Sequence, residues 1–321
     1  MEVSYSKAGY RSRLFAFFFD AMCVTFLSLL LVFVTQKIMN NVSYYKDANE
    51  KINEIQLASH LYKERDDGTL KLKCDHYKIN NDDYEETIEI LDESLIEFYS
   101  DPLFFDQSDP KSGLYLYKTQ KIPEGENSSE LFVYEDENHT NIVPRASVSD
   151  EKIYDWLCKA MSEDAVKYVI DNPDYISNSR TISLTHIFII LTIPIAFSIS
   201  VFEYVVPLFF YRGRKTFGKL IFKIAVVDNR GLSCPLGRFT LRFLFFLFLE
   251  VALSVVAFAI PFIISFSMFV FSKVGQSLHD YVMNTYVIEA PSTSVMISEE
   301  EYIEKMKKSK EYVLNKEDVA L

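Results

Sequence analysis

Five charged residues lie within or beside long apolar stretches of this 321-residue chain, where a charge is costly to bury: Arg13, Asp20, Glu203, Glu250 and Asp280. Arg13 and Asp20 are seven residues apart, about two helical turns, so both point from the same helix face. Such a pair can neutralise itself and fix helix packing. A carboxylate at membrane depth can instead bind a proton or a cation in competition. The sequence leaves the structural and the functional interpretation open.

Three apolar blocks must position these charges, and they occupy residues 14–35, 181–211 and 242–272. The first has about the 20 residues that a helix needs to cross a bilayer. A cleaved signal peptide is the alternative, but Asp20 suits an apolar signal core poorly and no small-residue cleavage site follows. The second block contains Pro194 and Pro207, which are expected to kink a membrane helix.

The third apolar block is long for one crossing and short for two full ones. Either it crosses once with a kink, or it forms a helical hairpin broken at Pro261. The hairpin is favoured because residues 285–290 alternate like a strand and suit pairing with residues 223–228, which brings both ends of the block to one side. The predicted fold class is therefore an all-α membrane protein with three to four transmembrane helices.

A large polar segment, residues 36–180, separates the first two blocks and carries 16 basic and 31 acidic residues. Its apolar residues recur at three- and four-residue spacing in three stretches, which predicts helices at 52–64, 85–99 and 150–171. Alternation predicts strands at 113–119 and 130–137, and a further short strand within 68–79. We expect a small α+β insertion, or a mostly helical one with a small sheet, outside the cytoplasm.

Basic residues suggest the orientation in the membrane. Residues 211–242 contain eight basic residues and one acidic residue, and the short N-terminus carries Lys7, Arg11 and Arg13. Positive charge favours the cytoplasmic side, so we expect the N-terminus and this loop inside and the acidic segment outside. The predicted organisation is an N-terminus with the first transmembrane helix (1–35), the acidic extracytoplasmic domain (36–180), the second transmembrane helix (181–211), the basic cytoplasmic loop with a short strand (212–241), the third apolar block (242–272) and an LHD segment with a strand and charged tail (273–321).

Three sequence runs together resemble the RDD family of membrane proteins, named for one arginine and two aspartates: AGYRSRLFAFFFD, KTFGKLIFKIAVVDNRGLSCPLGRFTLR and GQSLHDYVMNTYVI. The resemblance places the arginine on Arg13, the first aspartate on Asp20 and the second on Asp280. It covers roughly the first thirty residues and the last hundred or so before the tail, but not the middle. It implies an integral membrane protein, and some similar proteins have been proposed to be cation–proton antiporters.

The basic loop supplies four further candidates: Gly218, Lys219, Arg238 and Arg242. Gly218 and Lys219 do not form a phosphate-binding loop, because the earlier glycine and the following Ser or Thr are missing. Asp280 is expected either to cap a helix or to pair with a basic residue such as Arg238 or Arg242.

The sequence argues against several classes of function. Hydrolase, zinc-protease, Walker and dinucleotide motifs are missing, so an enzyme is not expected and no cofactor is predicted. The four cysteines lack metal-ligand spacing, so no metal site is predicted, and there is no large basic face for nucleic acid. Cys74 and Cys158 both fall in the acidic segment, where one disulfide and two unrelated thiols are the alternatives.

Two functions from different classes remain. The first is transport in the plasma membrane by intramembrane carboxylates, either exchange of monovalent cations for protons or transport of a small solute. In the exchange, Asp20 is the exchange carboxylate, Arg13 its modulator and Glu203 or Glu250 the relay. Because three to four helices enclose little space, this function calls for a homo-oligomer in the lipid bilayer. The second is a membrane-anchored binding, sensing or assembly module that displays the acidic domain, with the arginine–aspartate pair purely structural.

Overall fold

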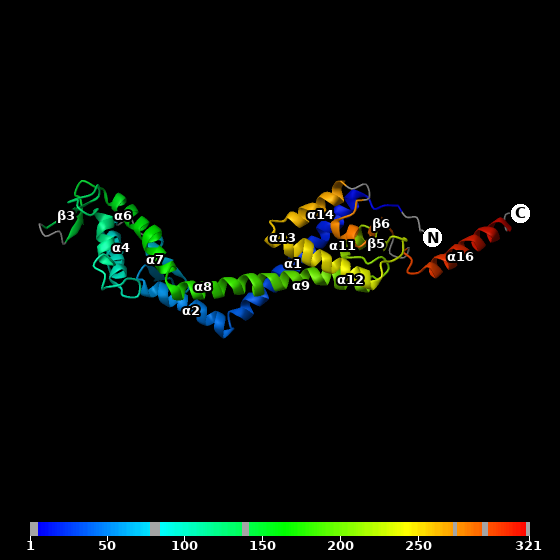
Figure 1. Ribbon diagram of the computed structural model, residues 1–321, viewed down its shortest axis with the longest axis horizontal. Helices are drawn as coiled ribbons and strands as arrows, with labels where there is room; N and C mark the ends of the chain where they lie inside the picture. The colour runs from blue at the N-terminus through cyan, green and yellow to red at the C-terminus, as the bar shows by residue number, and fades with distance from the viewer. Residues whose placement is uncertain (1–5, 78–83, 137–140, 272–274, 291–294, 319–321) are drawn as a thin grey trace. The chain divides into compact units, whose positions relative to one another are not determined.

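The computed structural model describes residues 6–77, 84–136, 141–271, 275–290 and 295–318, which are mostly helical (Figure 1). The chain divides into two compact units. Unit 1 comprises Met1–Lys37 and Phe188–Leu321, and unit 2 comprises Ile38–Ile187. Unit 2 is therefore an insertion within the sequence of unit 1, close to the predicted segment 36–180.

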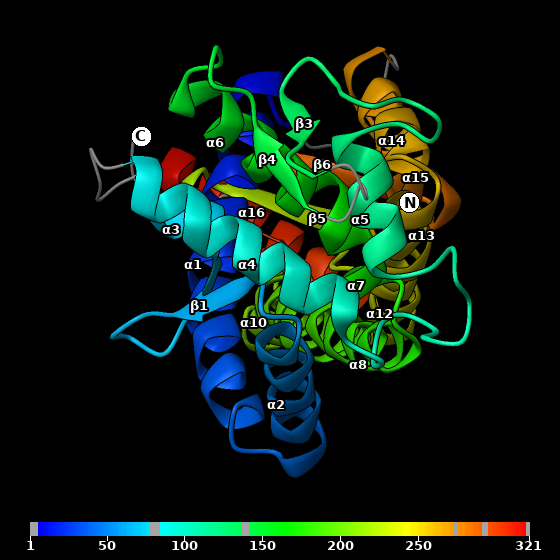
Figure 2. The same ribbon diagram turned by 90° about the vertical axis from the view of Figure 1, so that its left-hand side faces the viewer.

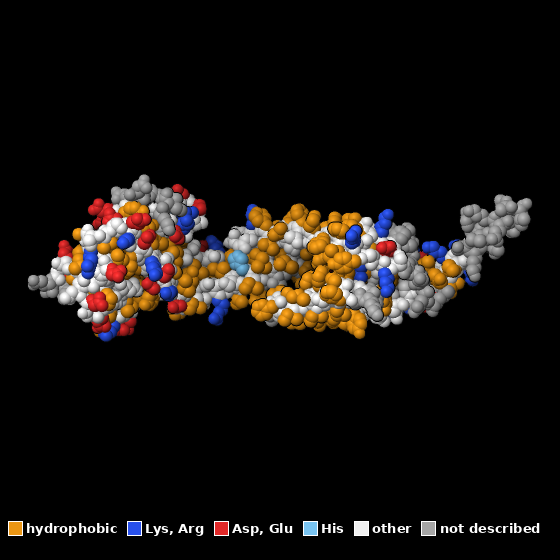
Figure 3. Space-filling model, turned by 90° about the horizontal axis from the view of Figure 1, so that it is seen from above, with side chains coloured by type: hydrophobic (Ala, Val, Ile, Leu, Met, Phe, Trp, Pro, Cys, Tyr) orange, Lys and Arg blue, Asp and Glu red, His pale blue; other side chains and the backbone are white. Residues whose placement is uncertain are grey.

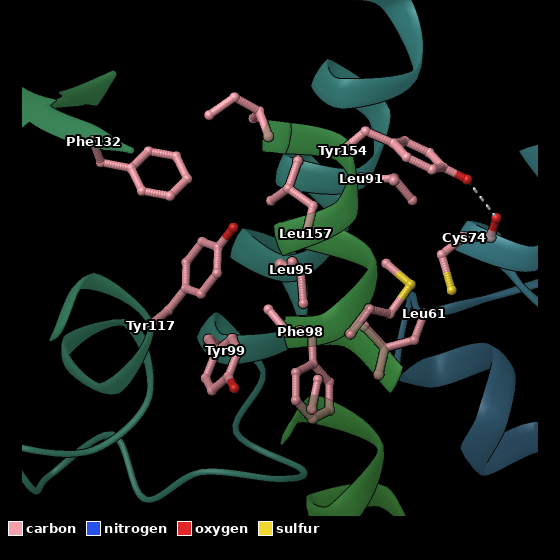
Figure 4. Packing of buried hydrophobic residues seen from close by; sticks show 14 of the residues in the cluster. Leu61, Cys74, Leu91, Leu95, Phe98, Tyr99, Tyr117, Phe132, Tyr154 and Leu157 are labelled. Atoms are coloured by element: carbon pink, nitrogen blue, oxygen red, sulfur yellow. Dashed lines mark hydrogen bonds between the residues drawn. The ribbon is translucent and has the colours of Figure 1, made fainter. Parts of the chain in front are cut away.

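Unit 2 is a helical domain with two small antiparallel β-hairpins, β1–β2 and β3–β4 (Figure 2). Its elements are α2 (Ser43–Ala58), β1 (Tyr62–Glu64), β2 (Leu70–Leu72), α3 (Lys73–Tyr77), α4 (Tyr84–Ser100), α5 (Leu114–Lys121), β3 (Phe132–Tyr134), β4 (Ile142–Pro144), α6 (Asp150–Lys159), the π-helical η1 (Ala160–Ala165), α7 (Val166–Ile170) and α8 (Pro173–Leu184). The core lies between α4 and α6, where Leu91, Leu95 and Phe98 meet Ile153 and Leu157 (Figure 4). These residues recur every three or four positions, so each helix buries one face.

The helix predictions for unit 2 are confirmed at 85–99 and 150–171, and the strand predictions are confirmed at β2 and β3. Two predictions are wrong. The stretch 113–119 forms helix α5, whose buried residues Tyr117 and Lys121 are four apart, a helical spacing. The predicted helix 52–64 ends at Ala58 and continues as strand β1, because His60 adopts a positive φ of 58° that a helix cannot continue through.

Two helices among the described residues are long and apolar enough to cross a membrane, Tyr10–Met39 and Pro173–Phe209, and the larger part of each belongs to unit 1. Its elements are α1 (Tyr10–Met39), η2 (Thr185–Thr192), α9 (Ile193–Ser200), η3 (Val201–Val205), α10 (Val206–Phe209), α11 (Phe217–Ile221), β5 (Ile224–Asp228), α12 (Leu236–Phe245), η4 (Phe246–Ala252), α13 (Leu253–Val256), α14 (Ile260–Phe271), α15 (Leu278–Val282), β6 (Thr285–Glu289) and α16 (Glu299–Asp318). Figure 3 shows hydrophobic side chains covering the outer face of unit 1. Phe26, for example, is 73% exposed, which suits contact with lipid rather than water.

The second helical run starts earlier than the predicted boundary at 181. It begins at Pro173, where Asn172 caps it by accepting hydrogen bonds from the next two free N–H groups. The run is continuous through Pro194 and Pro207. Short π-helical segments, η2 and η3, come just before each proline, and such segments accommodate a missing backbone donor.

The third apolar block is a helical hairpin, with α12, η4 and α13 forming one arm and α14 the other (Figure 1). The break lies at residues 257–259 rather than at Pro261, because Phe258 and Ala259 adopt positive φ angles of 48° and 62°. Pro261 instead occupies the first turn of α14, where its missing N–H costs nothing. The Ser254 hydroxyl accepts a hydrogen bond from the Phe262 amide at 3.1 Å and closes the turn.

The predicted pairing between residues 223–228 and 285–290 is confirmed. β5 and β6 are antiparallel, with Ile224 opposite Glu289 and Asp228 opposite Thr285. β5 is buried along its whole length. The other side of β6 meets the chain before α1, where Lys7 bridges to Ile288, so this small sheet gathers three distant parts of the sequence.

The core of unit 2 provides a first prediction, because neighbouring residues of α4 differ in burial. Leu95 is fully buried whereas Ile96 is 41% exposed. We expect Leu95→Ala to lower the free energy of unfolding of unit 2 by about 2–5 kcal/mol through loss of packing. Ile96→Ala, the matched control, should change it by less than about 1 kcal/mol. Denaturant unfolding followed by the fluorescence of Trp156, the chain's one tryptophan, measures both; equal effects would contradict this core.

Candidate functional site

All five charged residues singled out in the sequence line one cavity in unit 1, of about 170 Å³. Arg13 and Asp20 come from α1, Glu203 from η3, Glu250 from η4 and Asp280 from α15. Arg242, Lys219 and His279 share the cavity wall with apolar side chains such as Phe262 and Phe266. Three apolar blocks and the LHD segment thus bring their charges to one place.

Asp280 lies at the centre of the first of two charge clusters. Its Oδ1 accepts a hydrogen bond from Arg242 Nε at 2.8 Å and a second from the Thr285 hydroxyl at 2.9 Å, and its Oδ2 accepts one from the Ser277 hydroxyl at 2.8 Å. Arg13 Nη2 is 3.8 Å from the same carboxylate. The predicted pairing of Asp280 with a loop arginine is therefore confirmed for Arg242. Arg238 has no carboxylate partner in the part of the chain that the structure describes.

Glu250 and His279 extend this cluster. Glu250 Oε1 accepts hydrogen bonds from the His279 backbone amide at 2.8 Å and lies 2.9 Å from its ring Nδ1. Arg242 Nη2 is 2.9 Å from the other ring nitrogen, Nε2. Because a guanidinium only donates, Nε2 must accept and Nδ1 must carry the proton given to Glu250. His279 is thus assigned as the neutral Nδ1–H tautomer.

The first cluster is electrically balanced. Arg13 and Arg242 carry two positive charges, Asp280 and Glu250 carry two negative charges, and His279 is neutral. Burial alone would raise the pKa of Asp280, but the charges of Arg242 and Arg13 outweigh it and hold that pKa far below its usual value. The carboxylate therefore stays ionised through the physiological pH range. Such a cluster ties helices together and leaves no charge for a ligand.

Asp20 belongs to the second cluster and does not pair with Arg13. Seven residues separate the two along α1 by about 10 Å, too far for an ion pair. Asp20 Oδ1 instead accepts a hydrogen bond from the Gly218 amide at 2.7 Å, and Oδ2 accepts one from the Thr216 hydroxyl at 2.5 Å. Arg13 donates to the Gly275 carbonyl and stacks over the Phe269 ring at 4.6 Å. Mutual neutralisation of Arg13 and Asp20, one of the two interpretations that the sequence left open, therefore does not occur.

Gly218 is required because α1 and α11 approach closely there. A Cβ at this position would lie 2.2 Å from the Ala16 carbonyl oxygen and 2.9 Å from Asp20 Oδ2. Backbone at this distance cannot give way as a flexible side chain would. The glycine therefore serves helix contact and amide donation to Asp20 rather than phosphate binding.

Glu203 and Lys219 complete the second cluster. Lys219 Nζ is 3.5 Å from Glu203 Oε2, and the side chains are 15% and 22% exposed respectively. Together with Asp20 this cluster holds two carboxylates and one ammonium group, so it carries one net negative charge. The cavity therefore combines a balanced cluster with an unbalanced one. No group of three or more metal-ligating side chains occurs among the described residues.

Comparison with known protein families gives one match. The model of the RDD family matches residues 168–284. Residues 168–284 belong to the RDD family. RDD domains are membrane-associated, and with two membrane-length apolar helices this makes the chain a membrane protein. No curated protein and no solved structure matches the chain.

The RDD match contains Glu203, Lys219, Arg242, Glu250 and Asp280 but does not include α1, which lies earlier in the chain. Arg13 and Asp20 join the RDD residues only in the folded unit, where they line the same cavity. Sequence reasoning missed the hydroxyl donors at positions 216, 277 and 285. Two of them had a sequence signal, since a serine or threonine before a short helical run is a typical N-cap, and Thr216 and Ser277 occupy the N-cap positions of α11 and α15.

The contact at Gly218 predicts the effect of adding one methyl group. We expect Gly218→Ala to reduce the yield of folded protein several-fold, because the new Cβ overlaps the Ala16 carbonyl. Gly237→Ala in α12 is the matched control, since its Cβ meets nothing within 4 Å, and it should be neutral or stabilising by about 0.5–1 kcal/mol. Size-exclusion profiles and melting temperatures in detergent measure both, and a well-folded Gly218→Ala protein would contradict the contact.

The balanced cluster predicts a rescue. Asp280→Asn leaves Arg13 and Arg242 facing each other without their central counter-charge, at a cost of about 3–5 kcal/mol. We expect a large loss of folded protein. Adding Arg13→Gln to Asp280→Asn restores the charge balance and should recover part of the melting temperature. If the double variant is less stable than Asp280→Asn alone, the two arginines do not share that carboxylate.

Proposed function

We propose that unit 1 exchanges a monovalent cation for a proton, with Asp20 and Glu203 as the carboxylates that hold either one. The single observation that supports this is the unbalanced cluster, in which two carboxylates share the ammonium group of Lys219 inside a cavity. A net negative charge away from bulk water favours the uptake of one positive charge. A proton and a small cation both supply it.

Competition for that one charge is the source of coupling in this proposal. A proton on either carboxylate removes the charge that attracts the cation, and a bound cation disfavours protonation. The site therefore holds one or the other, never both. Exchange follows when the cavity opens to one side of the membrane at a time, and a homo-oligomer gives the small bundle enough helices to line a path.

The two carboxylates have different roles in the proposal. Asp20 is fixed by two hydrogen bonds, from Thr216 and Gly218, and is 3% exposed. Glu203 has one long contact, to Lys219, and is partly exposed. It also lies four residues before Pro207, which has no N–H to donate to the Glu203 carbonyl. We assign Asp20 as the fixed ligand and Glu203 as the mobile relay, with Glu250 and Arg13 kept in the balanced cluster.

The proposed orientation in the plasma membrane places the N-terminus and the basic loop in the cytoplasm and unit 2 outside. The excess of basic residues between 211 and 242 supports it. The hairpin supports it as well, because α12 starts and α14 ends near the β5–β6 sheet, which keeps both ends on one side. With α1 and the run Pro173–Phe209, the hairpin arms give up to four membrane helices.

The test is a transport assay in reconstituted vesicles with an imposed proton gradient. We expect Na⁺, Li⁺ or K⁺ added outside to collapse the gradient with the wild-type protein. Asp20→Asn and Glu203→Gln should each lower the rate of cation-driven gradient collapse at least tenfold, because each removes one negative charge and leaves the site neutral. Glu300→Gln is the matched control, an exposed carboxylate on α16. A folded wild-type protein that collapses the gradient with none of the three cations would refute the exchange.

The alternative is a membrane-anchored binding module. Residues 38–167 lie outside the RDD match and have a hydrophobic core of their own, which suits a separate binding task. In that case Asp20→Asn lowers the amount of folded protein through its lost contacts and has no effect on ion fluxes. The same vesicle assay, read at matched protein content, separates the two functions.

A further inference from the structure

Two cysteines of unit 2 lie side by side in its core. Cys74 is in α3 and is 4% exposed, and Cys158 is in α6 and packs against the same buried cluster. The Cys74 side chain interacts with that of Cys158. Cys23 and Cys234 belong to unit 1, so this is the pair that unit 2 itself holds.

The neighbouring contact fixes how α3 and α6 face each other. Tyr154 lies one helical turn before Cys158, so the two side chains share a face of α6. The Tyr154 hydroxyl donates a hydrogen bond to the Cys74 carbonyl at 3.0 Å (Figure 4). That bond holds the Cys158 side of α6 against α3, and the thiols meet as a result.

We propose that Cys74 and Cys158 form a disulfide that joins α3 to α6 in the mature protein. The two thiols lose two protons and two electrons, and the S–S bond forms. The electrons pass to the disulfide of a thiol–disulfide oxidoreductase, which becomes a dithiol. The inference rests on the proposed orientation, because disulfides persist in oxidising compartments and unit 2 must be outside the cytoplasm.

Such a bond has a measurable effect on stability. It closes the chain between residues 74 and 158 and so restricts the unfolded state. Between the two cysteines the chain passes through α4, α5, β3 and β4. We expect reduction to lower the melting temperature of unit 2 by about 5–15 °C.

The first experiment counts free thiols in the full chain taken from native membranes. The hydrogen bond from Cys158 and burial both raise the pKa of the Cys74 thiol, so the folded thiol alkylates poorly and the protein must be denatured first. Alkylation without reductant should label Cys23 and Cys234 alone, and peptide mapping should find Cys74 joined to Cys158. Labelling of all four cysteines overturns the proposal.

The second experiment separates the bond from the packing of its side chains. Trp156 lies two residues before Cys158 and packs against Phe132 at 4.8 Å, so its fluorescence reports the unfolding of unit 2 in the full chain. Reductant should lower the melting temperature of the wild type and leave a Cys74→Ser/Cys158→Ser variant unchanged. Equal melting temperatures of the wild type with and without reductant count against the disulfide.

A third arm distinguishes failure of the disulfide from failure of the proposed orientation. The purified chain is incubated with oxidised glutathione and mapped again. If the thiols are free in native membranes but join here, unit 2 lies in a reducing compartment and the orientation is wrong. If they stay free here too, the α3–α6 contact is wrong. Neither result bears on cation exchange, which the vesicle assay tests separately.

Discussion

The buried ionic contact between Asp280 and Arg242 is the interaction on which the rest of unit 1 depends. It ties α15 to α12 at 2.8 Å, and Arg13 brings the start of α1 to the same carboxylate. Burying any one of these charges alone would cost too much desolvation free energy, so residues from three separate segments must come together in the folded unit. The small β5–β6 sheet beside them sets the register that makes this delivery possible.

The charges that line the cavity fall into two clusters, one electrically balanced and one with a surplus carboxylate. The balanced charges hold helices together, and His279 contributes by contacting Glu250 with one ring nitrogen and Arg242 with the other. The second cluster also joins helices, since Asp20 on α1 accepts hydrogen bonds from Thr216 and Gly218, but it holds one carboxylate more than its single ammonium group. That surplus charge is what the proposed exchange would use to attract a cation.

The sequence predicted the elements better than the contacts. The membrane helices, the hairpin and the β5–β6 pair follow from length and periodicity, and the five charged residues followed from the cost of burying them. Sequence spacing did not identify the partners, because Asp20 meets Thr216 and Gly218 from a segment nearly two hundred positions away. Likewise α5 was mistaken for a strand, since eight residues with alternating apolar side chains satisfy both periods.

The insertion of unit 2 is compatible with the cavity for a reason internal to that unit. Its first helix, α2, packs along its last, α8, and the Tyr45 hydroxyl lies 3.3 Å from the His186 ring. A domain whose two ends lie together enters a loop without forcing the flanking helices apart. Arg13 and Asp20 on α1 can therefore line the same cavity as Glu203, although nearly 200 residues separate them in the sequence. For the same reason unit 1 is one compact body even though the RDD match begins at residue 168 and does not include α1.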